Sequence, residues 1–202
     1  MKKIYACTTV GTTRYIGEWI CPIKKINPCK IAIARDLSRS EPIPDDLHVY
    51  VINYDTKKPW ISYEKRHEGW VSDESILKGI VLLIDDMLKT DATHFLHIDS
   101  DVILSDKAIT MLTTNKWDYL QFGIPVTPRE SMDKIMIFWE STNFGISKTI
   151  AEKILPELSA TKNPYPVDIN IHKAIRKYFM GIHLNITCAG VSHYIKGERI
   201  TL

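Results

Sequence analysis

The sequence lacks a long apolar stretch. None of its runs approaches the roughly 18 consecutive apolar residues that a membrane-spanning helix requires. The first residues, MKKIYACTTVGTTR, carry a basic pair, but Arg14 cuts their apolar run short, which is atypical of a secretory signal peptide. We therefore expect no transmembrane segment and a cytoplasmic protein, with peripheral attachment to a membrane left open.

Strong charge and paired cysteines are also missing. The 202 residues carry a formal net charge of only +2, which is too small to indicate a nucleic-acid partner. The 4 cysteines include no Cys-x-x-Cys pair, so neither a zinc site nor a disulfide framework is indicated. The chain has no internal repeat, low-complexity tract or linker. The length and the lack of a linker therefore predict one globular domain over residues 1–202.

Strand and helix patterns alternate through the first half of the chain. Short apolar, β-branched runs predict strands, and residues 73–90 have the spacing of a helix that Ser72 would cap. The expected strands lie at 4–10, 29–36, 47–55, from 94 onward and at 117–126. Further helices are expected from Thr13, at 107–115, at 149–158 and at 167–181, the last ending at Gly181. This order predicts an α/β fold with a mostly parallel central sheet flanked by helices on both faces.

Polar residues stand at the carboxyl ends of three expected strands. Thr8 and Thr9 lie near the end of the first strand, and Arg35 and Asp36 end the second. Asp-Ser-Asp, at 99–101, follows the buried run HFLHI. Because ligands of such sheets bind beyond the carboxyl ends of the strands, we expect these residues to gather at one edge.

The Asp-Ser-Asp at 99–101 has two interpretations. Its carboxylates repel each other and resist burial, but together they suit a hard divalent cation, which binds through oxygen. Alternatively the segment is a tight turn, followed by Ser105 or Asp106 as the cap of the next helix. The pattern alone does not decide, since 14 aspartates give about one Asp-x-Asp by chance. His94 and His97, three apart on the strand, are expected on opposite faces and receive no role.

Three short pieces of the chain resemble a known family. HFLHIDSD (94–101) is similar to the metal-binding Asp-x-Asp of small GT-A-fold glycosyltransferases, and the resemblance extends to PVDINIHKAI (166–175) and HYIK (193–196). It covers most of the chain in the order of elements. It implies a GT-A-like single domain with a Rossmann-like nucleotide-binding half at 1–105 and an acceptor-binding half at 106–202. The implied reaction is metal-dependent transfer of a hexosyl group from a nucleotide-diphosphate sugar to a hydroxyl on an unidentified glycan, lipid or protein.

The resemblance implies a metal and phosphate site. Asp99 would face the ribose or a metal-bound water, with Ser100 beside it in the nucleotide-sugar site. Asp101 would ligate a Mn²⁺ or Mg²⁺ that bridges the two phosphates. His193 stands where many members supply a late metal ligand, and Lys196 would meet the diphosphate.

The resemblance also implies contacts to the base and to the acceptor. Asp36 would hydrogen-bond the base or the ribose, with Thr8 and Thr9 flanking the base. Asp168 matches the general base of inverting members, although Val167 departs from their usual Glu-Asp pair. As a carboxylate in the first turn of a helix, Asp168 would be kept ionised by the helix dipole.

Several of these residues have simpler alternatives. Asp168 would also stabilise a helix N-terminus, His193 would serve as an ordinary loop histidine, and Asp36 would form a turn. Arg66, in EKRHEGW, reaches a phosphate in one interpretation and is solvated in the other.

Two other functions compete with glycosyl transfer. Sugar-phosphate nucleotidyltransferases share a related α/β layout, but they resemble one another in a glycine-rich loop with Arg and Lys after the first strand. Here that place is TTVGTTRY, with one glycine. A non-catalytic nucleotide-sugar-binding module is the other alternative. A dinucleotide-dependent dehydrogenase is disfavoured because no G-x-G-x-x-G follows the first strand. The donor sugar, the acceptor and the anomeric outcome stay open.

Overall fold

The computed structural model describes residues 2–10, 13, 15–38, 41–57, 70–123, 125–126, 137–138, 142–162, 166–187, 192–195 and 198–201. The strands are β1 (Ile4–Val10), β2 (Lys30–Asp36), β3 (Tyr50–Tyr54), β4 (His94–His97), β5 (Val102–Ile103), β6 (Tyr119–Gly123), β7 (Pro125–Val126), β8 (Ile137–Phe138), β9 (Phe144–Ser147), β10 (His183–Thr187), β11 (Ser192–Ile195) and β12 (Glu198–Thr201). The helices are α1 (Ile16–Lys25), the short 3₁₀ helix η1 (Asp45–Leu47), α2 (Trp70–Leu88), α3 (Asp106–Thr114), α4 (Lys148–Ser159) and α5 (Val167–Tyr178).

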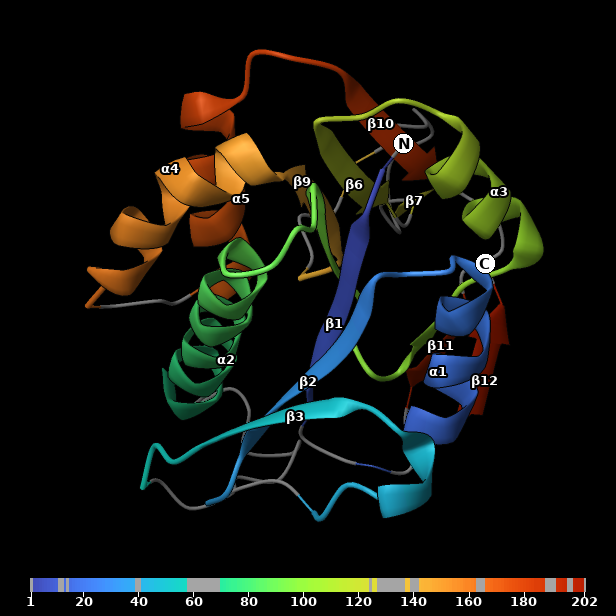
Figure 1. The fold of residues 1–202 in the computed structure, drawn as a ribbon, viewed down its shortest axis with the longest axis vertical. Coiled ribbons are helices and arrows are strands. Elements are labelled where there is room, and N and C mark those ends of the chain that lie inside the picture. The colour runs from blue at the N-terminus through green and yellow to red at the C-terminus, as the bar shows by residue number, and fades with distance from the viewer. Residues whose placement is uncertain are drawn as a thin grey trace.

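A 7-stranded sheet forms the centre of the molecule, in the order β10-β6-β9-β4-β1-β2-β3 (Figure 1). β1 pairs in parallel with β2 and β4, β2 with β3, and β6 with β10, whereas β9 is antiparallel to both of its neighbours. β5 belongs to a small second sheet, in which it pairs with β11. The expected α/β class with a mostly parallel central sheet is confirmed.

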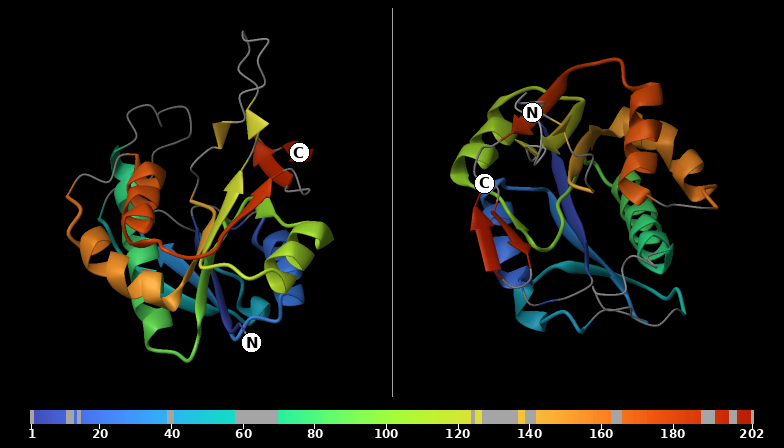
Figure 2. Two further views of the ribbon diagram at one scale, coloured as in Figure 1. Left: turned by 90° about the horizontal axis from the view of Figure 1, so that it is seen from above. Right: turned by 180° about the vertical axis from the view of Figure 1, so that it is seen from behind.

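Helices cover both faces of this sheet (Figures 1 and 2). α1 and α3 pack on one face, and α2, α4 and α5 pack on the other, so two separate apolar clusters flank the strands. Side chains alternate along β1 accordingly: Tyr5 and Cys7 join the α2 cluster, while Ala6 joins the α1 cluster. No helix in the described ranges is both long and apolar enough to cross a membrane.

Both helical layers make close contacts near the carboxyl ends of the strands. The indole N–H of the fully buried Trp19, in α1, donates to the carbonyl of Ile98 at 3.1 Å, which fixes the residue before Asp99. On the other face, a Cβ on Gly79 would lie 2.7 Å from Thr9 Cγ2 and 2.8 Å from the Tyr54 hydroxyl. Glycine therefore lets α2 approach the ends of β1 and β3.

Two expected helix ends are wrong. α2 begins at Trp70, so Ser72 lies inside the helix and is not its N-cap. α5 ends at Tyr178 because Phe179 is extended, with φ −74° and ψ 125°, so Gly181 lies beyond the helix. A Cβ on Gly181 would overlap the carboxylate of Asp118, which accepts the N–H of Ile182 at 2.9 Å. That glycine is thus required by a close approach rather than by a helix cap.

Candidate functional site

The Asp-Ser-Asp forms the turn that joins β4 to β5. The N–H of Val102 donates to the carbonyl of Asp99 at 3.0 Å, which closes the turn. Ser105 caps α3, since its hydroxyl accepts the N–H of Ala108 at 3.1 Å. The turn that the sequence offered as an alternative therefore exists. Neither of these hydrogen bonds uses a carboxylate, so the turn alone does not account for two aspartates.

The carboxylate of Asp99 is held by the segment that precedes β9. The Thr142 hydroxyl lies 2.6 and 2.7 Å from its two oxygens, and Asn143 Nδ2 donates to Oδ2 at 2.8 Å. The backbone N–H of Asp99 donates to Asn143 Oδ1 at 2.7 Å. The side chain keeps a relative exposure of 29%, so it still reaches solvent. Asp99 is therefore oriented by protein donors and accessible at once.

His97 is fully buried beneath this turn. Its Nε2 accepts the backbone N–H of Thr9 at 3.1 Å, so the hydrogen of the neutral ring lies on Nδ1, which donates to the carbonyl of Thr142 at 2.7 Å. Burial lowers the pKa of His97, against the opposing effect of the Asp99 carboxylate. The ring therefore stays neutral near pH 7 and joins the ends of β1 and β4 to the start of β9.

The implied metal ligands lie in the turn before β5 and on β11, the strand that pairs with β5. Asp101 is partly exposed and Ser100 is buried at 8% exposure, and β5 follows them directly. The register of β5 with β11 pairs Val102 with His193, so the backbone brings His193 beside the turn. The two carboxylates fit Mn²⁺ or Mg²⁺, whereas an imidazole fits Mn²⁺ better than Mg²⁺, which prefers oxygen ligands. Among the side chains that the structure describes, which do not include that of His193, no group of three or more acidic, His or Cys residues forms a metal site.

Asp36 forms a second anchored carboxylate at the same edge, although it is 1% exposed. Its Oδ1 accepts the N–H and hydroxyl of Ser38 and the N–H of Thr56, at 2.7–3.2 Å. Its Oδ2 accepts the hydroxyls of Thr56 and Ser75, at 2.6 and 2.7 Å. Burial alone would raise the pKa of Asp36, but the hydrogen bonds from Thr56, Ser75 and Ser38 outweigh it and hold the pKa well below its usual value. Asp36 thus ties the end of β2 to the residues that follow β2 and β3 and to α2.

The two threonines at the end of β1 differ in their surroundings. The side chain of Thr8 is fully buried, and its hydroxyl donates to the carbonyl of Thr9 at 3.3 Å. Thr9 is partly exposed and lies against α2 near Gly79. Of the two, only Thr9 is exposed to a ligand in this arrangement, and contact with a base stays a prediction for both.

The remaining expected residues lie apart from this cluster or outside the described ranges. Asp168 is in the first turn of α5, where its Oδ1 accepts the N–H of Ile169 at 2.8 Å. That contact fits helix stabilisation, and a role as general base stays a prediction. Arg66 and Lys196 lie outside the residues that the structure describes.

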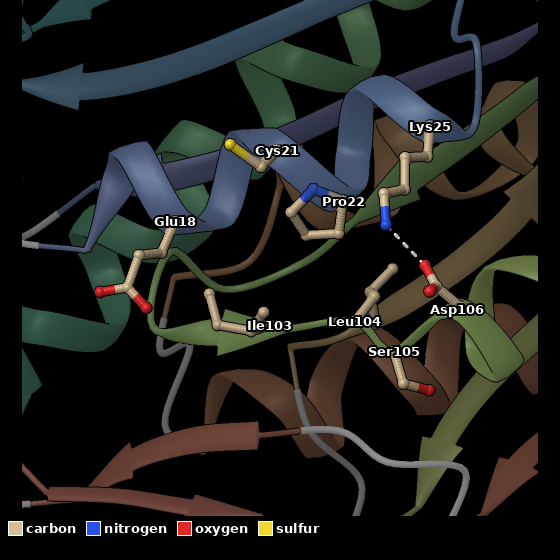
Figure 3. Close-up of a pocket in the computed structure, with 8 residues that line it drawn as sticks. All are labelled: Glu18, Cys21, Pro22, Lys25, Ile103, Leu104, Ser105 and Asp106. Atoms are coloured by element: carbon tan, nitrogen blue, oxygen red, sulfur yellow. Dashed lines mark hydrogen bonds and ion pairs between the residues drawn. The ribbon is translucent and has the colours of Figure 1, made fainter.

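An open groove of about 520 Å³ runs beside the turn (Figure 3). α1 lines one side with Glu18, Cys21, Pro22 and Lys25, and residues 103–106 line the other. Lys25 Nζ pairs with Asp106 Oδ1 at 2.7 Å across one end. None of the expected site residues whose side chains the structure describes lines this groove, so it is distinct from the carboxylate cluster.

Sequence reasoning missed three residues that shape the cluster: His97, Thr142 and Asn143. The register of β4 with β9 pairs His97 with Phe144, which brings the two polar residues before Phe144 level with Asp99. The polar pair Thr-Asn before the apolar run FGI is the only local signal, and it does not say which strand β9 joins. The spacing of the histidines gives no signal for His97, because His94 lies three residues away on the opposite face of the strand.

Comparisons with known proteins place the fold. No family model matches the chain, and no curated protein matches its sequence. Among solved structures, the chain is similar to a protein assigned as a glucose-1-phosphate thymidylyltransferase from Bacillus anthracis, in complex with sucrose. The identity is 10%, the match covers 93% of this chain and 87% of that chain, and the TM-score is 0.52. The protein A197 from STIV matches with 10% identity, 98% and 90% coverage and a TM-score of 0.48. The first of these similarities shows that the chain shares the α/β fold of that protein, and it shows the fold alone.

Proposed function

We propose that this chain is a metal-dependent glycosyltransferase, which moves a sugar from a nucleotide-diphosphate donor to a hydroxyl acceptor. The observation that carries the proposal is the carboxylate pair at the carboxyl end of β4. Asp99 is held by donors only, and β11 runs beside Asp101. A closed turn needs neither carboxylate, whereas a divalent cation bound against a diphosphate is typically held by one or two of them.

The roles of the residues follow from the bonds that change. The bond from the sugar C1 to the leaving diphosphate breaks, a bond from C1 to the acceptor oxygen forms, and the acceptor proton must leave. Asp99, Asp101 and His193 would hold Mn²⁺ or Mg²⁺, which neutralises the charge that grows on the diphosphate. Lys196 and Arg66 would add positive charge to the phosphates. Asp168 would take the acceptor proton as the general base.

The nucleotide contacts belong to the same proposal. Asp36, Thr8, Thr9 and Ser100 stand at or next to the carboxyl ends of β1, β2 and β4, where nucleotides bind in sheets of this type. Because Asp36 and Thr8 are enclosed by protein, we expect them to shape the base site from beneath, with Thr9 at its surface.

A sugar-phosphate nucleotidyltransferase is the second candidate, and one observation favours it. A solved structure that is similar over most of both chains, with a TM-score of 0.52, is assigned to that activity. The reaction would join a sugar phosphate to a nucleoside triphosphate and release pyrophosphate. The single glycine in TTVGTTRY weighs against it, since the loop lacks the glycines of a phosphate cradle. The fold favours this candidate, and the residues favour glycosyl transfer.

The first experiment measures binding, by calorimetric titration with UDP, GDP and dTDP in the presence and absence of Mn²⁺. We expect at least one nucleotide to bind only with Mn²⁺, and Asp101→Ala to abolish that binding. Asp91→Asn is the matched control, because Asp91 is an exposed carboxylate paired with Lys3 at the opposite end of β4. Absence of metal-dependent binding for all three nucleotides would overturn the proposal.

The second experiment separates the two reactions by their products. The protein that binds nucleotide is incubated with the matching nucleotide sugar, or with the nucleoside triphosphate and a sugar 1-phosphate, and the phosphorus species are resolved by NMR. Free nucleoside diphosphate from the sugar donor supports glycosyl transfer. Pyrophosphate from the triphosphate supports the nucleotidyltransferase. Metal-dependent binding without either product indicates a non-catalytic nucleotide-sugar-binding module.

A further inference from the structure

The side chain of Asn143 meets Asp99 twice. The backbone N–H of Asp99 donates to Asn143 Oδ1 at 2.7 Å, and Asn143 Nδ2 donates to Asp99 Oδ2 at 2.8 Å. A backbone N–H can only donate and a carboxylate ion can only accept, so a single orientation of the amide satisfies both contacts. Asn143 is 7% exposed, which limits competition from water. The pair therefore fixes the backbone and the carboxylate of Asp99 together.

The donors to Asp99 are anchored to the centre of the sheet. Thr142 donates its hydroxyl to the carboxylate, and its carbonyl accepts the Nδ1–H of His97 at 2.7 Å. His97 in turn accepts the N–H of Thr9, so the hydrogen bonds run from β1 through His97 to the segment that holds Asp99. The segment before β9 cannot shift without breaking its contacts to His97 in β4 and to Asp99 in the turn that follows.

We infer that Asn143 is a positioning residue, which acts with Thr142 to hold the carboxylate of Asp99 in the orientation that binds Mn²⁺ beside a nucleotide diphosphate. This inference rests on the proposed function. Two donors converge on the carboxylate and no hydrogen is needed from it, so the clamp suits the ionised form that a cation requires. Partners that orient a metal-ligating carboxylate typically change metal affinity about 10–100-fold when they are removed.

The test compares variants of Asn143 and Thr142 with a buried hydroxyl far from the turn. Asn143→Ala removes the reciprocal pair, and Thr142→Val removes the hydroxyl with little change of shape, while Thr142→Ser keeps it. Tyr119→Phe is the matched control, because the buried Tyr119 hydroxyl bonds to His172 near the amino ends of β6 and β10. Binding of Mn²⁺, alone and with UDP, GDP or dTDP, is followed by the electron paramagnetic resonance signal of the free ion.

We expect Asn143→Ala and Thr142→Val to weaken Mn²⁺ binding by at least about tenfold. The Mn²⁺ affinities of Thr142→Ser and Tyr119→Phe should stay within about twofold of that of the unmodified protein. This should hold even if Tyr119→Phe lowers the melting temperature as much as the other variants do. Equal affinity in all variants overturns the inference while leaving the proposed function intact. A loss in Tyr119→Phe that matches Asn143→Ala also overturns it, since the effect would then be general destabilisation. Absence of Mn²⁺ binding by the unmodified protein rejects both proposals.

A second readout needs no metal. The amide hydrogen of Asp99 is bonded to Asn143 Oδ1, so its exchange with solvent should be slow in the unmodified protein and at least about tenfold faster in Asn143→Ala. The amide of Val102, which bonds to the carbonyl of Asp99, is the internal reference for the turn itself. An unchanged exchange rate at Asp99 would show that Asn143 does not hold this residue.

Discussion

Replacing Asp36 tests whether its carboxylate stabilises the fold or instead contacts a nucleotide directly. Asp36→Ala leaves buried donors from Ser38, Thr56 and Ser75 without their acceptor. A buried donor left without an acceptor costs about 1–3 kcal/mol, and some of these hydroxyls can rotate to other partners, so we expect a total loss of about 3–5 kcal/mol. At about 2–4 °C per kcal/mol for a chain of this size, the melting temperature should fall by about 6–20 °C.

Asp36→Asn is the sharper variant, because its consequences differ at the two oxygens. The amide oxygen can replace Oδ1, which accepts the backbone N–H groups of Ser38 and Thr56. The amide nitrogen then faces the hydroxyls of Thr56 and Ser75, which can rotate to accept from it. Only the charge is lost, so we expect a smaller cost of about 1.5–3 kcal/mol, measured by urea unfolding at pH 7.

The dependence of this cost on pH has a defined sign. The folded state lowers the pKa of Asp36, so its carboxylate stabilises the fold above the unfolded pKa, near 3.9. That contribution is lost as the pH falls below this value toward the folded pKa. The stability difference between the natural chain and Asp36→Asn should therefore be constant from pH 7 to 5 and shrink below about pH 4.

Two outcomes would refute this reasoning. Asp36→Asn within about 0.5 kcal/mol of the natural chain at pH 7 would show that the five hydrogen bonds do not stabilise the fold. Unchanged stability together with lost nucleotide binding would instead make Asp36 a direct ligand contact. If Asp36→Asn is less stable but still binds nucleotide with metal at low temperature, the result supports our expectation that Asp36 shapes the base site from beneath.

Two further predictions concern the helices that frame the site. Gly79→Ala should cost about 1–3 kcal/mol in urea unfolding, because its Cβ would lie 2.7 Å from Thr9 Cγ2. Gly17→Ala, whose Cβ meets nothing within 4 Å, is the matched control and should not destabilise the fold; equal losses would contradict the close-packing argument. Ser105→Ala should lower the free energy of unfolding by about 1 kcal/mol, because it removes the cap of α3. Ser147→Ala is the control and should cost less, since Ser147 starts α4 without a side-chain cap bond, and the reverse order would contradict the capping geometry.

The first half of the fold could be predicted because its signals are local. The runs 4–10 and 29–36 are apolar and β-branched, and the structure has β1 at Ile4–Val10 and β2 at Lys30–Asp36. The gathering of strand ends at one edge then follows from parallel pairing. The sequence predicts that this helix starts at residue 73, whereas α2 starts at Trp70. A serine followed by acidic residues resembles a helix start wherever it occurs, so the pattern does not exclude an earlier start.

The surroundings of Asp99 could not be predicted, because they depend on pairing between distant segments. β9 lies between β4 and β6 and runs against both, and nothing local in FGIS specifies those neighbours. Thr142 and Asn143 reach Asp99 only through that register. The same holds for His193, which the pairing of β11 with β5 brings beside the turn.

The two anchored carboxylates explain why nucleotide binding should need a cation. Asp36 accepts donors that follow it in the chain, and Asp99 accepts donors from a strand that folds back from the far half. In both cases the surrounding groups donate hydrogen bonds to the carboxylate, and for Asp36 they hold the pKa well below its usual value. The edge where a nucleotide would bind therefore carries fixed negative charge before any ligand arrives. A diphosphate brought to that edge is repelled unless a divalent cation stands between them, and the repulsion is strong where water is excluded. The proposed metal dependence thus follows from how these two side chains are held, and binding of a nucleotide diphosphate without metal would mean that it occupies another part of the molecule.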